Sequence, residues 1–394
     1  MALISKILHK KYFWIALIIA GLLIKIPFFP VKNGDYRDFL VHWVDFIREY
    51  GYFASLKYRF HNYTPAYMYI LVFIVKSGLY PLYTIKVVSI LFEYLVAFFI
   101  GKIVCLKYKN KLYMLVCLAI IPIIPTVFMN SLLFSQCDSI YSAFAIGSVY
   151  FLLNKRPWTS ALFLAFSFMF KLQSLFLLPF FFIMMLKNHI KYYHFIIIPL
   201  VYVISIIPAN IVGRPFNELM NIYLMQADFY SKLTMNFPNI YVFISNNYAY
   251  IAKPAGIIIS VFFTLIIGWY FYRDKTDLSF ENKIRLVFAS AVIVPFILPG
   301  MHDRYMYLAD VLGVTYFLII RKRIFIPLSA LLVSTYAYIR FFLSYRYLHL
   351  SPAAILYFFV IIWIFEDFVD NYLHNKTKST IFVADNCEIK DEKS

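Results

Sequence analysis

Long apolar runs, separated by short polar stretches, make up most of this chain. A helix crosses the roughly 30 Å hydrocarbon core of a bilayer with about 20 apolar residues, and most of the runs approach that length. The pattern predicts an all-α integral membrane protein, a multi-helix bundle of about 12 transmembrane helices. The predicted crossings are 12–29, 84–106, 112–129, 139–154, 157–170, 174–186, 195–212, 252–272, 284–299, 306–320, 324–344 and 352–368. The two short runs 157–170 and 174–186 are interpreted as half-helices that meet at a polar break.

Two of the polar segments are long, residues 31–83 and residues 213–251. The first has a helical period in which apolar residues share one face and acidic residues lie on the others. The apolar face holds Phe39, Trp43, Phe46 and Ile47, and the acidic residues are Asp38, Asp45 and Glu49. This pattern predicts an outer loop with an amphipathic helix that lies on the membrane surface.

The apolar stretch 66–80 decides the orientation. It is short and contains Lys76 and Gly78. If it crossed the membrane, the four lysines between 102 and 111 would lie outside, against the positive-inside rule. We therefore interpret 66–80 as an interfacial or re-entrant helix on the outer face. Both chain ends are then cytoplasmic, and 22 of the 37 Lys and Arg residues fall in short cytoplasmic segments.

Composition argues against a soluble protein. Hydrophobic residues make up 62% of the 394 residues and charged residues only 14%, whereas soluble domains carry about 25% charged residues. The net charge is +17, but the basic residues sit in short clusters between apolar runs, so no nucleic-acid partner is predicted. We expect one transmembrane domain over 1–370, with the N-terminal apolar stretch retained as its first helix. A polar cytoplasmic tail over 371–394 is expected to be unstructured beyond Asn375.

Little in the sequence points to a metal or redox site. The four cysteines show no metal-ligand or redox spacing, and they are interpreted as small buried hydrophobic residues. They are Cys105, Cys117, Cys137 and Cys387. No dedicated carboxylate cage for a cation is visible either. The sequence therefore predicts no metal ligand, although a divalent cation stays compatible with it.

Polar residues at membrane depth are costly, so each one requires a reason. In the predicted topology they gather on the outer side. Asp35 follows the turn signal Asn33-Gly34 and either caps the amphipathic helix or faces a cavity outside the first crossing. His61, further along the same segment, is interpreted as a surface residue.

Two later positions on the same side hold further polar residues. Gln136 and Asp138 lie at the mouth of the crossing 139–154, where Asp138 suits a helix cap. Lys171 and Gln173 lie between two very apolar runs. A lysine in such a place either extends to the interface or binds an anion.

The last polar turn, directly before 306–320, carries four consecutive polar residues. They are His302, Asp303, Arg304 and Tyr305. The Asp–Arg pair is either a local structural pair or part of an anion pocket. Arginine binds phosphate through a bidentate fork, and lysine binds it as a point charge. A lipid-linked phosphate sugar would explain these features together, with its phosphate at Lys171 and Arg304 and an acceptor hydroxyl at a carboxylate such as Asp35.

Blocks of sequence between Asn33 and Asp310 follow a known pattern. GDYRDFLVHW resembles GDFEAQRHW of a first outer loop, and NYTPAYMY resembles DYPPLTAY. FSQCDSIYSAF is similar to DYGHFQYN, or in bacteria to GQxDAxYA. FKLQSLFLLP resembles FKQMSLYYSP and the bacterial FKLQALFLLP, and MHDRYMYLAD resembles the bacterial MHERYFFLAD. Through these blocks the chain resembles the GT-C superfamily of polyprenyl-phosphate-sugar-dependent glycosyltransferases. It looks most like bacterial relatives of the GPI-anchor second mannosyltransferase, and it is similar to dolichyl-phosphate-glucose glucosyltransferases.

The resemblance implies a GT-C type bundle that moves a hexose (mannose, glucose or galactose) from a polyprenyl-phosphate donor, with inversion. The acceptor would be lipid- or polymer-linked, on the outer face of a bacterial plasma membrane. The catalytic base of the family's first block maps to Asp35, but the spacing to His42 is one residue longer here, which leaves Asp38 as the alternative. We expect Lys171, His302 and Arg304 to hold the donor phosphate. The other residues expected to bind substrate are Gln136, Asp138, Gln173, Asp303, Tyr305, His42 and Tyr63.

Two other functions compete with this one. An envelope polysaccharide polymerase or ligase would use a polyprenyl-diphosphate donor and rely on outer-loop arginines, but 213–251 contains only Arg214 as arginine. A non-enzymatic lipid or solute transporter would show a repeat and polar residues at the membrane midplane. The sequence shows no convincing repeat, and its polar clusters lie near one face.

Overall fold

The computed structural model describes residues 10–229, 231–274, 276–343 and 348–391, with the side chains of these ranges except 228 and 373–391. Most of this chain is α-helical. The α-helices are α2 (Lys11–Leu23), α3 (Val41–Glu49), α4 (Pro65–Lys76), α5 (Pro81–Tyr108), α6 (Leu112–Ile120), α7 (Pro125–Phe128), α8 (Asp138–Leu153), α9 (Pro157–Phe170), α10 (Leu178–Leu186), α11 (Ile197–Ile211), α12 (Phe216–Met220), α13 (Ile222–Phe229), α14 (Ala249–Arg273), α15 (Phe280–Ile297), α16 (Tyr307–Ile320), α17 (Phe325–Phe342) and α18 (Ser351–Asp391).

Shorter elements complete the fold. The 3-10 helices are η1 (Ile26–Phe28), η3 (Tyr52–Lys57), η4 (Ile121–Ile123), η6 (Leu172–Leu177), η7 (Tyr192–Ile196), η8 (Ile240–Phe243) and η9 (Asn246–Tyr248). Two segments are π-helical, η2 (Tyr36–Leu40) and η5 (Met129–Leu133). The strands β1 (Thr234–Met235) and β2 (Met301–His302) pair in parallel, and the sequence pattern did not predict them.

The structure confirms the all-α class and supports a membrane protein. Among the described residues, six helices are long and apolar enough to cross a bilayer, or seven if a pair bent by 60° counts as one span. The six are Lys11–Phe28, Pro81–Tyr108, Tyr192–Ile211, Asn246–Arg273, Phe325–Phe342 and Ser351–Tyr372, and the bent pair is Leu112–Ile123 with Pro125–Leu133. The other predicted crossings are helical, but their helices are shorter than these spans. Helix α15 is long enough but carries Glu281, Lys283 and Arg285 near its start. Twelve crossings therefore stay a prediction.

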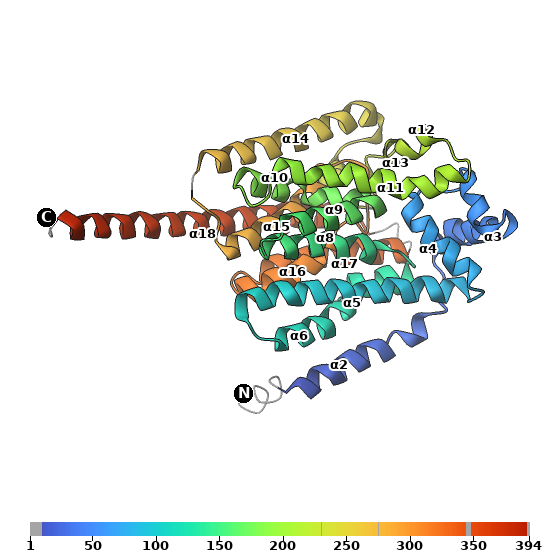
Figure 1. Cartoon of the computed structure of the whole chain (residues 1–394), viewed down its shortest axis with the longest axis horizontal. Coiled ribbons are helices and arrows are strands. Elements are labelled where there is room, and N and C mark those ends of the chain that lie inside the picture. Colours follow the sequence, from blue (N-terminus) through green and yellow to red (C-terminus); the bar gives the residue numbers. More distant parts are fainter. Residues whose placement is uncertain (1–9, 230, 275, 344–347, 392–394) are drawn as a thin grey trace.

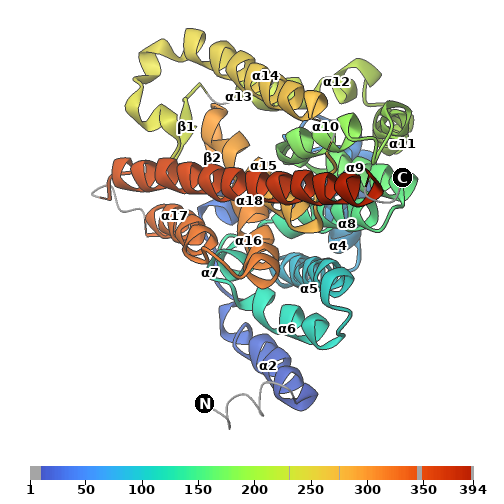
Figure 2. The same cartoon turned by 90° about the vertical axis from the view of Figure 1, so that its left-hand side faces the viewer.

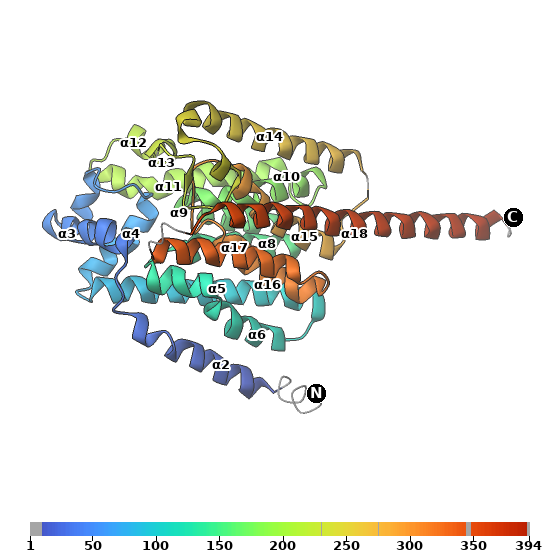
Figure 3. The same ribbon diagram turned by 180° about the vertical axis from the view of Figure 1, so that it is seen from behind.

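Figures 1 and 3 show the bundle helices running along its long axis. Both ends of the described chain lie at one end of the bundle, and α3 and α4 lie at the other. Helices α2 and α6 form one edge and α14 the opposite edge (Figure 2). The two long polar segments of the sequence thus meet at a single end, where α12 and α13 lie beside α11 (Figure 1).

The stretch 66–80 lies at the same end as α3, and its place on the outer face of a membrane stays a prediction. Its helix α4 is only 12 residues long and begins with Pro65, whose missing N–H costs nothing in the first turn. It packs against α3, α5 and α11, and most of its residues are buried. This helix is therefore enclosed by its neighbours instead of lying open on a surface.

The amphipathic helix predicted within residues 31–83 is confirmed as a helix with one buried and one exposed face, whereas its place on a membrane surface stays a prediction. Trp43 and Ile47 are buried on the inner side of α3, while Asp45 and Glu49 are exposed. The prediction of an unstructured tail beyond Asn375 is wrong, because the backbone of α18 stays helical as far as Asp391. Residues 392–394 of that tail lie outside the described part of the chain, as does the side chain of Cys387.

Close approach between helices holds the bundle together. A side chain on Gly147 would bring its Cβ within 2.5 Å of the Phe163 ring, so α8 and α9 can pack as they do only around this glycine. Ser160 donates to the Ser148 carbonyl at 2.7 Å across the same interface. Cys117 and Cys137 are buried, as expected for small hydrophobic side chains.

A buried ion pair ties the first helix to the rest. The Lys25 ammonium donates to the Glu93 carboxylate on α5, and the Ser131 hydroxyl donates to the same carboxylate. The two charged side chains are 1% and 0% exposed. A buried charge left without its partner is costly, so this contact fixes α2 against α5.

We expect Glu93→Gln to destabilise the protein by roughly 3–5 kcal/mol, because it leaves the Lys25 ammonium buried without a counter-charge. The measurement is thermal unfolding of the purified chain in detergent. The double variant Lys25→Met/Glu93→Leu, which removes both charges, should recover much of the loss. A double variant as unstable as Glu93→Gln would contradict a role for the ion pair.

Candidate functional site

A cavity of about 360 Å³ lies where the first long polar segment, residues 31–83, meets the bundle. Five parts of the chain that are far apart in sequence line it, within residues 35–67, 135–136, 232–236, 302–304 and at Phe341. The polar side chains among its lining include Asp35, Asp38, Gln136, Lys232, His302 and Arg304. The sequence predicted all of these except Lys232.

The backbone between η1 and η2 is held so that the Asp35 carboxylate lines the cavity. The Lys86 ammonium donates to the carbonyls of Phe28, Phe29 and Val31 at 2.7–3.0 Å, which fixes the chain as it leaves η1. Asn33, not Asp35, caps the next element, since its Oδ1 accepts from the Tyr36 N–H at 3.0 Å. Of the two alternatives for Asp35, a cap or a cavity residue, the structure shows the second.

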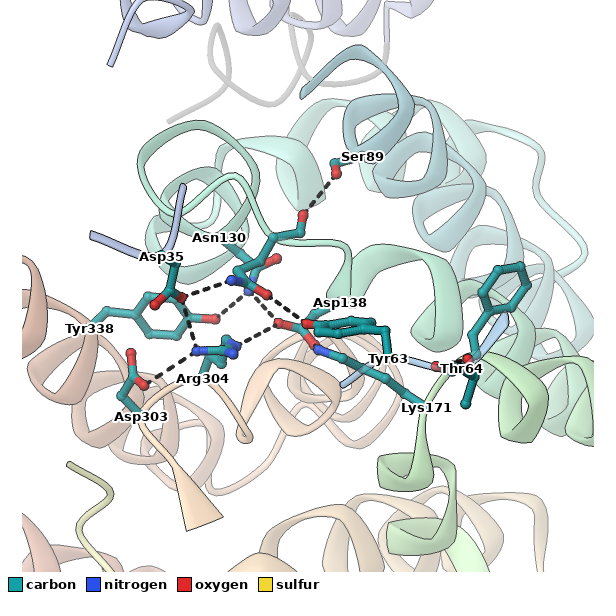
Figure 4. Close-up of polar contacts among 12 residues, drawn as sticks. Asp35, Tyr63, Thr64, Ser89, Asn130, Asp138, Lys171, Asp303, Arg304 and Tyr338 are labelled. Atoms are coloured by element: carbon teal, nitrogen blue, oxygen red, sulfur yellow. Dashed lines mark hydrogen bonds and ion pairs between the residues drawn. The ribbon is translucent and has the colours of Figure 1, made fainter. Parts of the chain in front are cut away.

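Figure 4 shows Asp35 held by two partners that come from distant turns. Its Oδ2 accepts from Nε2 of Gln136 at 2.8 Å and from Nη1 of Arg304 at 3.3 Å. The Tyr63 hydroxyl in turn donates to Oε1 of Gln136 at 3.2 Å, which fixes the orientation of the amide. The Asp35 side chain is 15% exposed, so the carboxylate remains reachable from the cavity.

Asp138 lies behind Asp35 and Arg304, away from the cavity, and its side chain does not cap α8. Its carboxylate accepts from the Lys171 ammonium and from Nδ2 of Asn130, the latter at 2.8 Å. The Nε of Arg304 lies 3.7 Å from the same carboxylate. Lys171 therefore neither extends to the interface nor lines the cavity, because it is paired with Asp138 (Figure 4).

Irregular backbone brings these groups together. The π-helical segment η2 follows Asp35, and the π-helical segment η5 precedes Gln136. Lys171 has an extended backbone (φ −151°, ψ 139°) between α9 and η6, which is the polar break that the sequence predicted. Such interruptions of regular helix are common at functional sites.

Lys232 reaches the cavity through the short β-pair. Thr234 pairs with Met301 and Met235 pairs with His302 in parallel register. The Asp303 N–H also donates to the Met235 carbonyl at 3.1 Å. This contact places the exposed Lys232 at the cavity mouth. A strand of two residues has no usable periodicity, so no sequence signal marked Lys232 as part of the site.

Burial shifts the pKa values of His302, the last residue of β2, and of Asp303, the residue after it. Burial raises the pKa of Asp303 to about 7, with Arg304 opposing this change and Asp35 and Asp138 adding to it. The pKa of His302 lies well below its ordinary value, because of burial first and then of Arg304 and Lys171. The lowered pKa favours a neutral His302 ring, so the positive charge of this turn comes from Arg304.

We expect Asp303→Asn to remove a pH dependence of stability. The folded pKa of Asp303 is raised from 3.8 to about 7, so its contribution to stability is fully present below the unfolded pKa and is lost as pH rises through the folded one. Between these values the wild type should lose about 1.4 kcal/mol per pH unit relative to the variant. Thermal unfolding of both proteins across this range measures the difference. A difference that does not change with pH would contradict the raised pKa.

Several predicted site residues do not line the cavity. His42 is exposed on α3, and Gln173 and Tyr305 are half-buried. The Tyr305 ring instead packs near the His302 ring, with 5.2 Å between centroids. Asp38 lies exposed on the cavity lining, near Gly34.

The interpretation of His61 as a surface residue is wrong. Its side chain is buried, and its Nε2 accepts from Nη1 of Arg214 at 3.0 Å. Arg214 comes from the other long outer segment, directly after α11. The contact between the two segments hides His61, and a single sequence carries no signal for such a long-range pair.

Within the part of the chain that the structure describes, no group of three or more His, Cys, Asp or Glu residues is arranged to hold a metal ion. Comparisons with protein-family models, with curated proteins and with solved structures found no match to this chain. The site consists of the Asp35 carboxylate at the cavity wall, the buried network of Arg304, Asp138 and Lys171 behind it, and Lys232 at the cavity mouth.

Proposed function

We propose that the chain is an inverting glycosyltransferase that moves a hexose from a polyprenyl-phosphate donor to an acceptor outside the membrane. The observation that carries the proposal is the Asp35 carboxylate, which lines a cavity together with Arg304 and Lys232 at one end of an apolar helical bundle. This arrangement offers a carboxylate base and two cations to a reaction that needs both. The resemblance of the surrounding sequence blocks to GT-C glycosyltransferases supports the same activity.

In this proposal Asp35 takes the proton of the acceptor hydroxyl as that oxygen attacks the anomeric carbon of the sugar. The bond between this carbon and the phosphate oxygen breaks, and polyprenyl phosphate leaves with the bonding electrons. The Arg304 guanidinium and the Lys232 ammonium stabilise the charge that develops on the leaving phosphate. Gln136 and Tyr63 hold the Asp35 carboxylate in its orientation.

An apolar groove supports a lipid-linked donor. A cavity of about 410 Å³ lies among α10, α14, α15 and α18, and nearly all of its lining side chains are apolar. At one end it reaches Leu298, four residues before His302 in the first cavity. A prenyl chain in this groove would place its phosphate toward the Arg304 side of the first cavity.

The test is transfer by the purified full chain in lipid nanodiscs, with synthetic prenyl-phosphate hexoses and envelope extracts as acceptor source. Consumption of a monophosphate donor, with release of prenyl phosphate, is the expected result. Activity only with a diphosphate donor would instead indicate a polysaccharide polymerase or ligase. Translocation of the lipid across the bilayer without cleavage of the sugar would indicate a transporter.

A further inference from the structure

A second cavity, of about 240 Å³, adjoins the first and has no role in the reaction as described so far. The two share Phe39, Trp43 and Asn62 as lining residues. The indole of Trp43 lies between them, with its ring centroid 5.4 Å from that of Tyr63 on one side and 6.4 Å from that of His61 on the other. A ligand that extends past Trp43 would therefore occupy both cavities.

Two arginines give the second cavity its charge. Arg214 is 2% exposed and Arg59 is exposed, and both line the cavity. Among the side chains that the structure describes, no carboxylate lines it. This second cavity is therefore positive, in contrast to the first, where acidic side chains accompany the cations.

The charge of Arg214 is only partly balanced by protein groups. Its Nε makes no hydrogen bond with the described residues and lies 3.9 Å from the half-exposed carboxylate of Glu218. Burial lowers the pKa of this guanidinium, Glu218 opposes the change, and Arg59 adds to it. A buried cation beside a second cation is unfavourable unless an anion accompanies them.

The histidine beside Arg214 is suited to a neutral state. An arginine can only donate, so Nε2 of His61 must accept the 3.0 Å contact from Nη1 of Arg214. Burial, and then Arg214, lowers the pKa of His61 to about 3. His61 therefore orients the guanidinium without adding charge, and the binding capacity of the cavity rests on the two arginines.

We propose that the second cavity binds a phosphate group of the acceptor, so that the acceptor is a phosphorylated molecule that lies along Trp43 with its reactive hydroxyl at Asp35. Two guanidinium groups match the geometry of phosphate oxygens. The acceptor role rests on the proposed transferase function, whereas the phosphate site itself does not.

The probe is sn-glycerol 3-phosphate, titrated calorimetrically into the full chain in nanodiscs of neutral lipid. Arg59→Gln is the first variant, because Arg59 is exposed and the fold does not depend on it. It should weaken binding by about tenfold, the effect of losing one charge-assisted hydrogen bond. Glu218→Gln removes the carboxylate that competes for Arg214, and it should strengthen binding severalfold.

Matched controls test whether the effect is specific to the second cavity. Arg48→Gln removes an exposed arginine that is paired with Asp45 on α3, and Arg37→Gln removes an exposed arginine of η2; neither residue lines either cavity. Neither variant should change the affinity for the probe. Binding that weakens as much in these two variants as in Arg59→Gln, or that ignores both Arg59 and Glu218, would overturn the proposal.

Two further measurements test the source of the phosphate and its role. If phosphatidylglycerol in the nanodisc displaces the probe but receives no hexose, the site holds a bilayer lipid that is not the acceptor, and the acceptor assignment is wrong. If the wild type transfers hexose equally well to acceptors with and without phosphate, the acceptor assignment fails while the transferase function stands. If the arginine-dependent site binds the probe but no donor is consumed, the transferase function fails and the acceptor assignment fails with it, leaving only a phosphate site.

Discussion

Replacing Asp35 with Asn should reduce transfer from a prenyl-phosphate hexose by roughly 10²- to 10⁴-fold, the usual contribution of a general base. Asn keeps an oxygen that can accept from Gln136 Nε2, so the shape of the site should persist. What the variant loses is the ability to take the acceptor proton. Donor binding should therefore change much less than turnover, and single-turnover transfer with a separate donor-binding assay measures both.

Asp38→Asn is the matched control for this prediction. It makes the same chemical change three residues further on, at an exposed carboxylate of the same cavity. Substitutions of this kind away from buried networks change free energies by about 0.5 kcal/mol or less, so its turnover should stay within a few-fold of the wild type. A large loss in Asp38→Asn, with little loss in Asp35→Asn, would exchange the roles of the two residues.

Replacing Arg304 with Gln should produce the second large effect, because this guanidinium serves both the site and the fold. It lies within 3.8 Å of the carboxylates of Asp35, Asp138 and Asp303. Its loss should lower kcat by about 10²- to 10³-fold, as removal of one transition-state donor does. It should also destabilise the protein by several kcal/mol, roughly 3–5, since the buried carboxylates lose their shared cation.

Arg304→Lys separates these two effects. Lysine keeps the positive charge among the carboxylates but lacks the planar fork that binds phosphate in a bidentate manner. We expect this variant to unfold near the wild-type temperature and to remain weak in transfer. Arg37→Gln, which removes an exposed arginine from η2, should affect neither property. Full activity in Arg304→Lys would show that only the charge matters.

Much of the architecture followed from periodicity and charge. The apolar runs predicted the helices, and the short apolar stretch 66–80 forms a helix at one end of the bundle, beside α3. The amphipathic face of α3 followed from the spacing of Trp43 and Ile47. These are local features, and local spacing is what a single sequence records directly.

Long-range pairing limited the prediction of the site. Lys171 and Asp138 were each predicted to meet a substrate; the structure pairs them across 33 residues of sequence and places neither on the lining of the first cavity. Lys232 lies just before β1, which pairs with β2, and His61 is buried where Trp43, Phe60 and Arg214 contact it. Such contacts depend on tertiary packing, which overrides the preferences of isolated segments.

The most direct test of the central claim is an experimental structure of the full chain with a bound prenyl-phosphate sugar. The account predicts a phosphate in contact with Arg304, the anomeric carbon facing the Asp35 side of the first cavity, and the prenyl chain along the groove among α10, α14, α15 and α18. A phosphate bound elsewhere, with Asp35 and Arg304 remote from the sugar, would contradict it.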